Sequence, residues 1–159
     1  MGVRCEDCAA ARGRRHQRRQ LLLGFLALLV VRSSPLRAAP DKAVATLKEL
    51  AQLWSAVKFI MPDVDGDDQP SIVVRLPGGG FYASSLICPH NKCEIMFVND
   101  PVTARNSFDL DVGAPVLACP CHFSAFDPAR DGKVIAGPAP NPPLQFKVEV
   151  RAGEVFVSR

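Results

Sequence analysis

Two short blocks of cysteine and histidine constrain this chain more than any other feature of its sequence. The first block is Cys88-Pro89-His90-Asn91-Lys92-Cys93, and the second is Cys119-Pro120-Cys121-His122-Phe123-Ser124. Each block offers one Cys and one His within reach of a single metal centre. We therefore expect a fold that brings two loops together around that centre.

The ligand types fit a [2Fe-2S] centre in which one iron has two thiolate ligands and the other has two imidazole ligands. Thiolates stabilise ferric iron, whereas neutral imidazoles remove negative charge from the second iron and raise the reduction potential. Each imidazole also keeps one ring nitrogen free. Electron and proton transfer can therefore be coupled at such a centre.

Two other interpretations use the same residues. The four ligands could form a tetrahedral structural zinc site, although the single residue between Cys88 and His90 is fewer than the usual two to four. A framework of disulfides alone would leave both histidines unexplained. A further CxxC pair, Cys5 and Cys8, lies in the N-terminal tail, where we expect unpaired thiols.

The two blocks resemble the Rieske iron–sulfur proteins, whose pattern is CxHxxC followed by CPCHxS. The resemblance covers about residues 58–159 and includes Gly137-Pro138-Ala139-Pro140, which is similar to the family's proline-rich loop over the cluster. It implies four ligands, two for each iron: Cys88 and Cys119 for one, His90 and His122 for the other. It also implies that Cys93 and Cys121 form a disulfide joining the two loops, which suits an exported protein.

Two further positions follow from the same resemblance. Ser124 matches the family's serine, whose hydroxyl is expected to donate a hydrogen bond to a bridging sulfide and raise the potential. Two residues later, high-potential members have a tyrosine that bonds a ligand sulfur, and this chain has Phe126. We predict a potential below that of members with both bonds, as would suit a donor such as menaquinol.

The body of the chain, residues 41–159, is predicted to be all-β. β-branched and aromatic runs between turns predict strands at 58–60, 72–76, 81–85, 116–118, 144–150 and 155–158. The last two flank a glycine turn and predict a hairpin. Apolar residues from Asp41 to Trp54 recur at helical spacing and predict one short helix.

By resemblance, this body is an antiparallel β-sandwich with a small cluster-binding subdomain, whose loops fall at about residues 86–140. The interval between the two blocks is longer than is usual in the family. We expect residues 98–115 to form an extra excursion near the cluster face.

Residues 1–40 differ from the body in charge, with eight Arg against two acidic residues. Arg18-Arg19-Gln20-Leu21-Leu22 opens an apolar run over 21–31 and matches a twin-arginine export signal. The residues before Pro40 make a poor cleavage site, which favours an uncleaved signal that anchors the chain with its body on the periplasmic side. The body has eleven basic and fourteen acidic residues and no basic patch, which argues against nucleic-acid binding.

Three functions are compatible with these observations. The first is the iron–sulfur subunit of a cytochrome bc-type quinol:cytochrome c oxidoreductase, in which His90 or His122 contacts quinol and the partners are cytochrome b and a c-type cytochrome. The second is the small subunit of a periplasmic molybdenum enzyme resembling arsenite oxidase, with a large molybdopterin subunit as partner. The third is a zinc-stabilised binding module. In the first two functions the chain is an electron-transfer subunit and is not catalytic alone.

Overall fold

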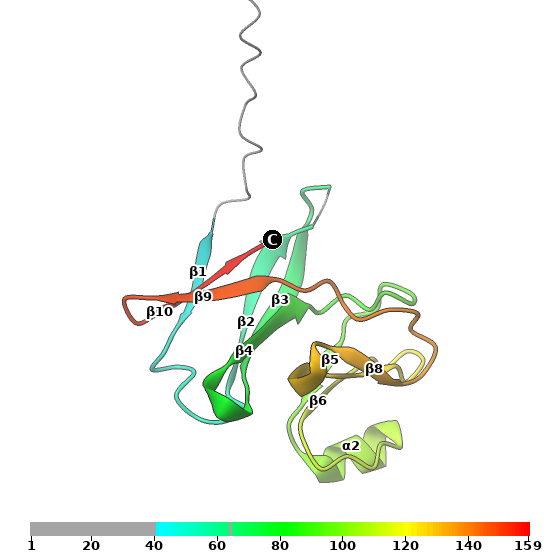
Figure 1. Cartoon of the computed structure of the whole chain (residues 1–159). Coiled ribbons are helices and arrows are strands. Elements are labelled where there is room, and N and C mark those ends of the chain that lie inside the picture. Colours follow the sequence, from blue (N-terminus) through cyan, green and yellow to red (C-terminus); the bar gives the residue numbers. More distant parts are fainter. Residues whose placement is uncertain (1–40, 64) are drawn as a thin grey trace, which may run out of the picture. The chain divides into compact units, whose positions relative to one another are not determined.

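The computed structural model describes residues 41–63 and 65–159, which form three antiparallel sheets. The first sheet has the order β1-β10-β9, and the second has the order β2-β3-β4. Their strands are β1 (Lys42–Thr46), β10 (Glu154–Ser158), β9 (Lys147–Arg151), β2 (Ala56–Pro62), β3 (Asp68–Arg75) and β4 (Phe81–Ser85). These two sheets make up a base lobe, residues 41–85 and 144–159 (Figure 1).

The second lobe, here called the loop lobe, comprises residues 86–143 and carries both Cys/His blocks. Its sheet has the order β5-β6-β7-β8, made of β5 (Met96–Val98), β6 (Val116–Ala118), β7 (Ala125–Asp127) and β8 (Lys133–Ala136). Helix α2 (Pro101–Phe108) lies between β5 and β6, and a 3-10 turn, η2 (Pro128–Arg130), lies between β7 and β8. A second 3-10 turn, η1 (Pro77–Gly79), precedes β4.

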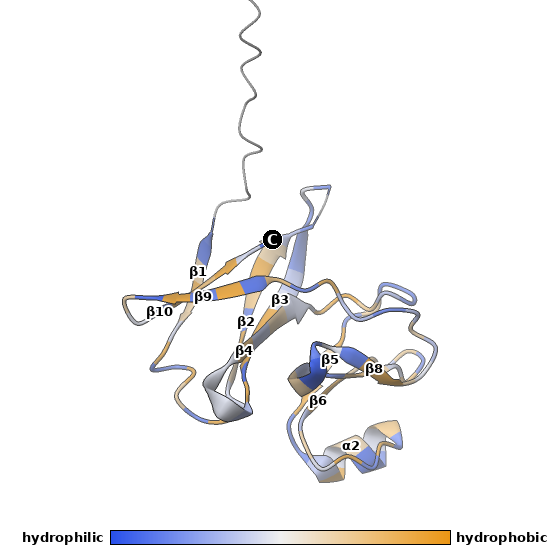
Figure 2. Ribbon diagram, viewed as in Figure 1, coloured by the Kyte–Doolittle hydropathy of each residue, from blue (hydrophilic) through white to orange (hydrophobic). Residues whose placement is uncertain are grey.

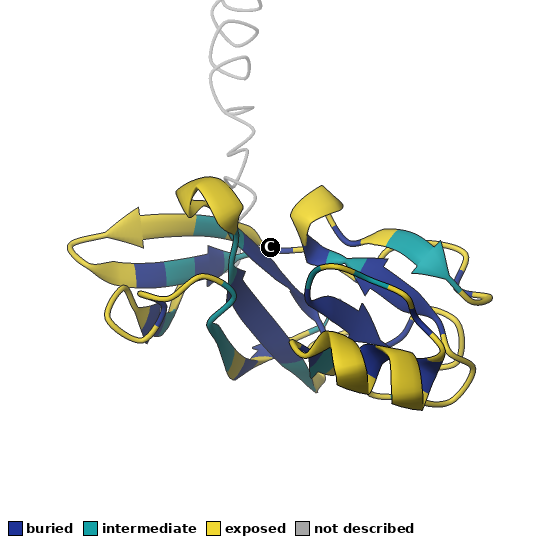
Figure 3. Ribbon diagram, turned by 90° about the horizontal axis from the view of Figure 1, so that it is seen from below, coloured by how far each residue is buried: buried dark blue, intermediate teal, exposed yellow. Residues whose placement is uncertain are grey.

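The sheet β2-β3-β4 is the central layer, because residues on both faces of β3 and β4 are buried. Along β3, Ile72 and Val74 pack with residues of the loop lobe, whereas Val73 between them packs with residues of the first sheet. Alternating residues of a strand point to opposite faces, so one apolar run supplies both cores. Figure 2 shows the hydrophobic residues gathered on these strands, and Figure 3 shows the central strands buried while α2 is largely exposed.

The connection after the loop lobe closes the base lobe. Ser85 donates its backbone N–H to the carbonyl of Leu144 at 2.8 Å, and Phe146 donates to the carbonyl of Ala83 at 3.0 Å. The chain then enters the β9–β10 hairpin, which confirms the hairpin expected from the glycine turn. The all-β fold expected from the sequence is confirmed as well.

The helix predicted from Asp41 to Trp54 is wrong. Residues 42–46 form β1, which pairs with β10 from Lys42 opposite Val157 to Thr46 opposite Glu154. Only a turn follows, closed by mutual hydrogen bonds between Thr46 and Glu49. The local spacing fitted a helix, but β10 needs a partner on its open side, and that contact is about 110 residues away in the sequence.

The excursion expected over residues 98–115 contains α2, a helix that was not predicted from the sequence. Asp100 caps the helix by accepting hydrogen bonds from the backbone of Val102 and Thr103, and Pro101 occupies the first turn. The helix buries Ala104 and Phe108 against the outer face of the loop-lobe sheet. The excursion therefore has a small core of its own.

The predicted twin-arginine signal, the anchor and the Cys5–Cys8 pair all lie outside the described residues. Among the residues that are described, no helix is both long and apolar enough to cross a membrane.

Candidate metal centre

The two Cys/His blocks form loops that close in the same way. In the first loop, which follows β4, Lys92 N–H bonds the Cys88 carbonyl and Cys88 N–H bonds the Cys93 carbonyl, both at 2.9 Å. In the second loop, between β6 and β7, Phe123 N–H bonds the Cys119 carbonyl at 3.1 Å.

The hydrogen bond from Cys88 N–H to the Cys93 carbonyl also has an equivalent in the second loop. There, Cys119 N–H bonds the Ser124 carbonyl at 2.8 Å. Lys92 and Phe123 both have left-handed backbones, with φ of 54° and 57°. Cys88 and Cys119 thus hold equivalent positions at the start of two matching turns.

These turns separate the thiols from the imidazoles. Cys88 and Cys119 are each 1% exposed, whereas His90 and His122 are exposed to solvent. The two imidazole rings lie 4.8 Å apart, centre to centre, and nearly perpendicular to each other. The loops therefore bring two thiols and two imidazoles together, with sulfur on the inside and nitrogen on the outside.

The surroundings of Cys88 favour its neutral thiol over its thiolate. Burial raises the pKa of the Cys88 thiol, the backbone N–H of His90 opposes that rise, and the neighbouring Cys119 thiol adds to it. Two adjacent buried thiolates would repel each other strongly. A cationic metal removes this cost by binding the thiolates directly, so the four side chains fit an iron–sulfur group.

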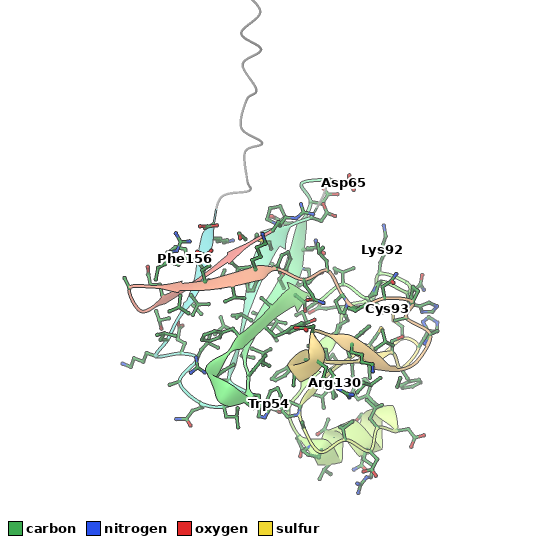
Figure 4. All side chains as sticks on the ribbon, in the orientation of Figure 1. Trp54, Asp65, Lys92, Cys93, Arg130 and Phe156 are labelled. Carbon is green, nitrogen blue, oxygen red and sulfur yellow. A yellow bond between two sulfur atoms is a disulfide. The ribbon has the colours of Figure 1, made fainter. Side chains whose placement is uncertain are left out.

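A disulfide between Cys93 and Cys121 joins the two loops, as the family resemblance implies. It links positions 28 residues apart, with the Cα atoms at 6.5 Å. The Sγ atoms of Cys93, Cys119 and Cys121 lie within 4.8 Å of one another. Because the disulfide occupies Cys93 and Cys121, only Cys119 of these three has a thiol for a metal. Figure 4 shows Cys93 and the exposed Lys92 at the edge of the loop lobe that lies away from Phe156.

A third loop, residues 137–140, packs on the second loop. Ser124 is fully buried, and its hydroxyl oxygen accepts a hydrogen bond from the backbone N–H of Ala139 at 3.1 Å. Gly137 has a φ of 79°, and a Cβ there would lie 2.4 Å from the Cα of Ser124. Only glycine allows this close approach. Since the Ser124 oxygen accepts from Ala139, its own proton is left for a second partner.

Phe126 belongs to the apolar core behind the thiols. It is fully buried in β7, within the same core cluster as Cys88 and Cys119. Its ring supplies no hydrogen-bond donor. Ser124 and Phe126 thus both lie near the candidate centre, and only Ser124 has a polar side chain.

The position of α2 beside this centre was not expected from the sequence. Phe108, at the end of α2, makes an edge-to-face contact with Phe123 of the second loop, with ring centres 6.4 Å apart. The sequence showed only that the interval between the two blocks is long, and this length does not predict the contact between Phe108 and Phe123.

A comparison with known families matches residues 45–152 to the Rieske [2Fe-2S] domain. The match covers both loops and all four strands of the loop-lobe sheet. The chain belongs to the Rieske [2Fe-2S] family. A Rieske domain carries a [2Fe-2S] cluster and transfers electrons through it, so this chain is an iron–sulfur electron-transfer protein.

Two curated relatives are similar over different lengths. The cytochrome b6-f complex iron–sulfur subunit of Chlorobaculum tepidum is 36% identical over 92 residues, which are 58% of this chain and 42% of that subunit. The subunit of the same name from Parasynechococcus marenigrum is 32% identical over 148 residues, which are 86% of this chain and 75% of that subunit. This Rieske chain thus spans less than half of the first relative.

A solved structure supports the fold. The soluble domain of Rieske protein II from Sulfolobus acidocaldarius aligns with a TM-score of 0.58 at 21% identity, covering 77% of this chain and 79% of that one. At this identity the likeness extends to the fold alone.

Proposed function

We propose that Cys88 and Cys119 bind one iron of the cluster and that His90 and His122 bind the other. The proposal is supported by the two buried thiols at matching turns and the two imidazoles 4.8 Å apart. When bound, the cluster supplies a reversible one-electron carrier. Cys93 and Cys121 stay in the disulfide and hold the loops together, while Ser124 and the loop with Gly137, Pro138 and Pro140 cover the centre.

The function that this geometry supports best is that of the iron–sulfur subunit of a quinol:cytochrome c oxidoreductase of the cytochrome bc type. The observation that carries it is the exposure of both imidazoles over a buried pair of thiols. An exposed imidazole edge can accept a hydrogen bond from a quinol hydroxyl and take up its proton. The relatives named as cytochrome b6-f iron–sulfur subunits point in the same direction.

This function implies partners and a location. We propose cytochrome b and a c-type cytochrome as partner subunits, with quinol as the donor. The loop lobe would face the outer side of the cytoplasmic membrane, and residues 1–40 would direct twin-arginine export and hold the chain at the membrane. These residues lie outside the described part of the chain, and their sequence alone supports this step.

The ligand assignment is tested by electron paramagnetic resonance on the reduced full-length protein. We expect a [2Fe-2S] signal in the wild type, its loss in His90→Ser and in Cys119→Ser, and its retention in Asn91→Ser, an exposed neighbour in the first loop. A colourless wild-type protein containing zinc would overturn the assignment.

The choice of complex is tested by isolating the full chain with its native partners from membranes. We expect haem b and haem c absorbance, together with reduction of cytochrome c by quinol that His122→Ser abolishes. Co-isolation with a molybdopterin subunit and without haem b would replace this function with that of a molybdenum-enzyme subunit.

A further inference from the structure

The sulfur of Cys119 lies beside the disulfide that joins the two loops. The Sγ atoms of Cys93, Cys119 and Cys121 lie within 4.8 Å of one another, and Cys88 does not belong to this group. Cys119 is therefore the one thiol in the described part of the chain that lies this close to both disulfide sulfurs. A disulfide is exchanged when a thiolate attacks one of its sulfurs directly. This arrangement thus holds an attacking sulfur next to its target.

The backbone of Cys119 is held in place by hydrogen bonds of its own turn. Its N–H bonds the Ser124 carbonyl at 2.8 Å, its carbonyl accepts from Phe123 N–H at 3.1 Å, and both bonds use backbone atoms only. The thiolate form of a cysteine is both the metal ligand and the nucleophile. Iron bound to Cys119 would engage the electron pair that attack on the disulfide requires. When iron is lost, the backbone bonds remain, and that electron pair becomes available beside the disulfide.

Burial decides which of the two disulfide sulfurs is the better target. Attack on Cys93 releases Cys121 as the leaving thiolate, whereas attack on Cys121 releases Cys93. Cys121 is exposed to solvent, and Cys93 is half-buried. A thiolate is more stable in water than at a partly buried position, and a more stable thiolate leaves faster. Attack on Cys93 is therefore favoured, and its product still links the two loops covalently.

We propose that loss of iron starts a thiol–disulfide exchange within this group of three sulfurs. The Cys119 thiolate attacks the Cys93 sulfur, the bond between Cys93 and Cys121 breaks, and Cys121 leaves as a thiolate. One disulfide replaces another, so the step consumes no oxidant and no reductant. The inference rests on the proposed role of Cys119 as a ligand. It makes Cys121 an exposed, reactive thiol and prevents Cys119 from binding iron again until a thiol reductant opens the new disulfide.

The test compares two full-length variants that each lack one of the proposed thiolate ligands. Cys88→Ser keeps the attacking sulfur, and its matched control, Cys119→Ser, removes it. Each protein is held without oxygen in mildly alkaline buffer with iodoacetamide, which traps a released thiol, and is then digested without reduction for disulfide mapping by mass spectrometry. In Cys88→Ser we expect a disulfide between Cys93 and Cys119, with Cys121 alkylated at least tenfold more than in Cys119→Ser.

Wild-type protein gives a second measurement that needs no substitution. Cys121 should stay unmodified while the electron paramagnetic resonance signal of the reduced cluster is present, and should become alkylated when a chelator removes the iron. Cys5 and Cys8 are present in both variants, so attack by these thiols would modify Cys121 equally in both and would overturn the inference. An unchanged disulfide in Cys88→Ser and in the chelated wild type would overturn it as well. A wild-type protein without a [2Fe-2S] signal would instead overturn the proposed ligand assignment.

Discussion

At the scale of single residues, Ser124 and Phe126 differ in the hydrogen bonds that they can offer to the proposed centre. The buried Ser124 hydroxyl already accepts from Ala139, so its proton is free for another acceptor. Phe126 lies in the core cluster of Cys88 and Cys119 and offers no donor. A hydrogen bond to a thiolate ligand stabilises the more negative, reduced state of a cluster.

Phe126→Tyr should therefore raise the reduction potential. A hydrogen bond to a charged group contributes about 1.5 kcal/mol, which corresponds to about 60 mV for one electron. A redox titration followed by electron paramagnetic resonance measures the shift. Phe59→Tyr, in the separate core of the base lobe, should leave the potential unchanged. An unshifted potential in Phe126→Tyr would show that the new hydroxyl does not reach a ligand.

The packing of the third loop on the second depends on Gly137. In Gly137→Ala the new Cβ would meet the Ser124 backbone at 2.4 Å, in addition to the unfavourable φ of 79°. Thermal unfolding should show a loss of about 3 kcal/mol, and the cluster absorbance should decay faster. Gly153→Ala shares the positive φ, at 84°, but has open space around its Cβ, so it should lose only about 1 kcal/mol. Equal losses would contradict the packing argument.

At the scale of elements, the disulfide joins two loops that hydrogen bonds close separately. For a closed loop of about 28 residues, chain entropy predicts a stabilisation of about 3.5 kcal/mol. We expect the double variant Cys93→Ser/Cys121→Ser to lower the unfolding free energy by that order and to shorten the lifetime of the cluster at elevated temperature. Wild-type protein incubated with a strong thiol reductant is the parallel measurement. Wild-type stability in the double variant would mean that the hydrogen-bonded turns suffice.

Helix α2 should loosen in acid because of its cap. Hydrogen bonds from the Thr103 side chain, the Thr103 N–H and the Val102 N–H lower the pKa of Asp100. A lowered pKa in the folded state stabilises the helix above the ordinary carboxyl pKa, and this stabilisation is lost as the pH falls through the folded value. Amide exchange at Val102 and Thr103 should therefore accelerate in acid relative to β3. Asp100→Asn keeps an acceptor but cannot titrate, so it should lack this extra acceleration.

The elements also show where sequence patterns fail. The β9–β10 hairpin was predictable because its pairing is local, across a glycine turn. β5, β7 and β8 are only three or four residues long, and their pairing partners define them as strands more than their own residues do. β1 was mistaken for helix because its partner lies at the opposite end of the described chain.

At the scale of the whole molecule, β1 completes the base lobe. Ala45 is buried against the core that contains Val155 and Val157, Arg151 forms an ion pair with Asp41, and Lys42 donates to the Ile60 carbonyl at 2.8 Å. These contacts tie the start of the body to both sheets of the base lobe.

A chain that begins at Asp41 should therefore fold and hold the cluster. A chain that begins at Leu47 lacks β1, and its free energy of unfolding should be lower by about 2–4 kcal/mol. This is the loss expected when a few backbone hydrogen bonds are removed. Chemical denaturation followed by circular dichroism measures the difference. Equal stability of the two chains would show that β10 does not need β1.

The sequence alone restricted the chemistry of this protein to a few kinds of site. The types and spacing of Cys88, His90, Cys119 and His122 allow few metal centres, because iron, sulfur and imidazole chemistry restricts which ligands can serve together. The tertiary structure decided which side chains are sheltered and which face solvent, with buried thiols, exposed imidazoles and Ser124 bonded to a third loop. It also placed α2 beside Phe123. These features depend on contacts between segments that are far apart in the sequence. Local sequence patterns do not predict the free energy of such contacts.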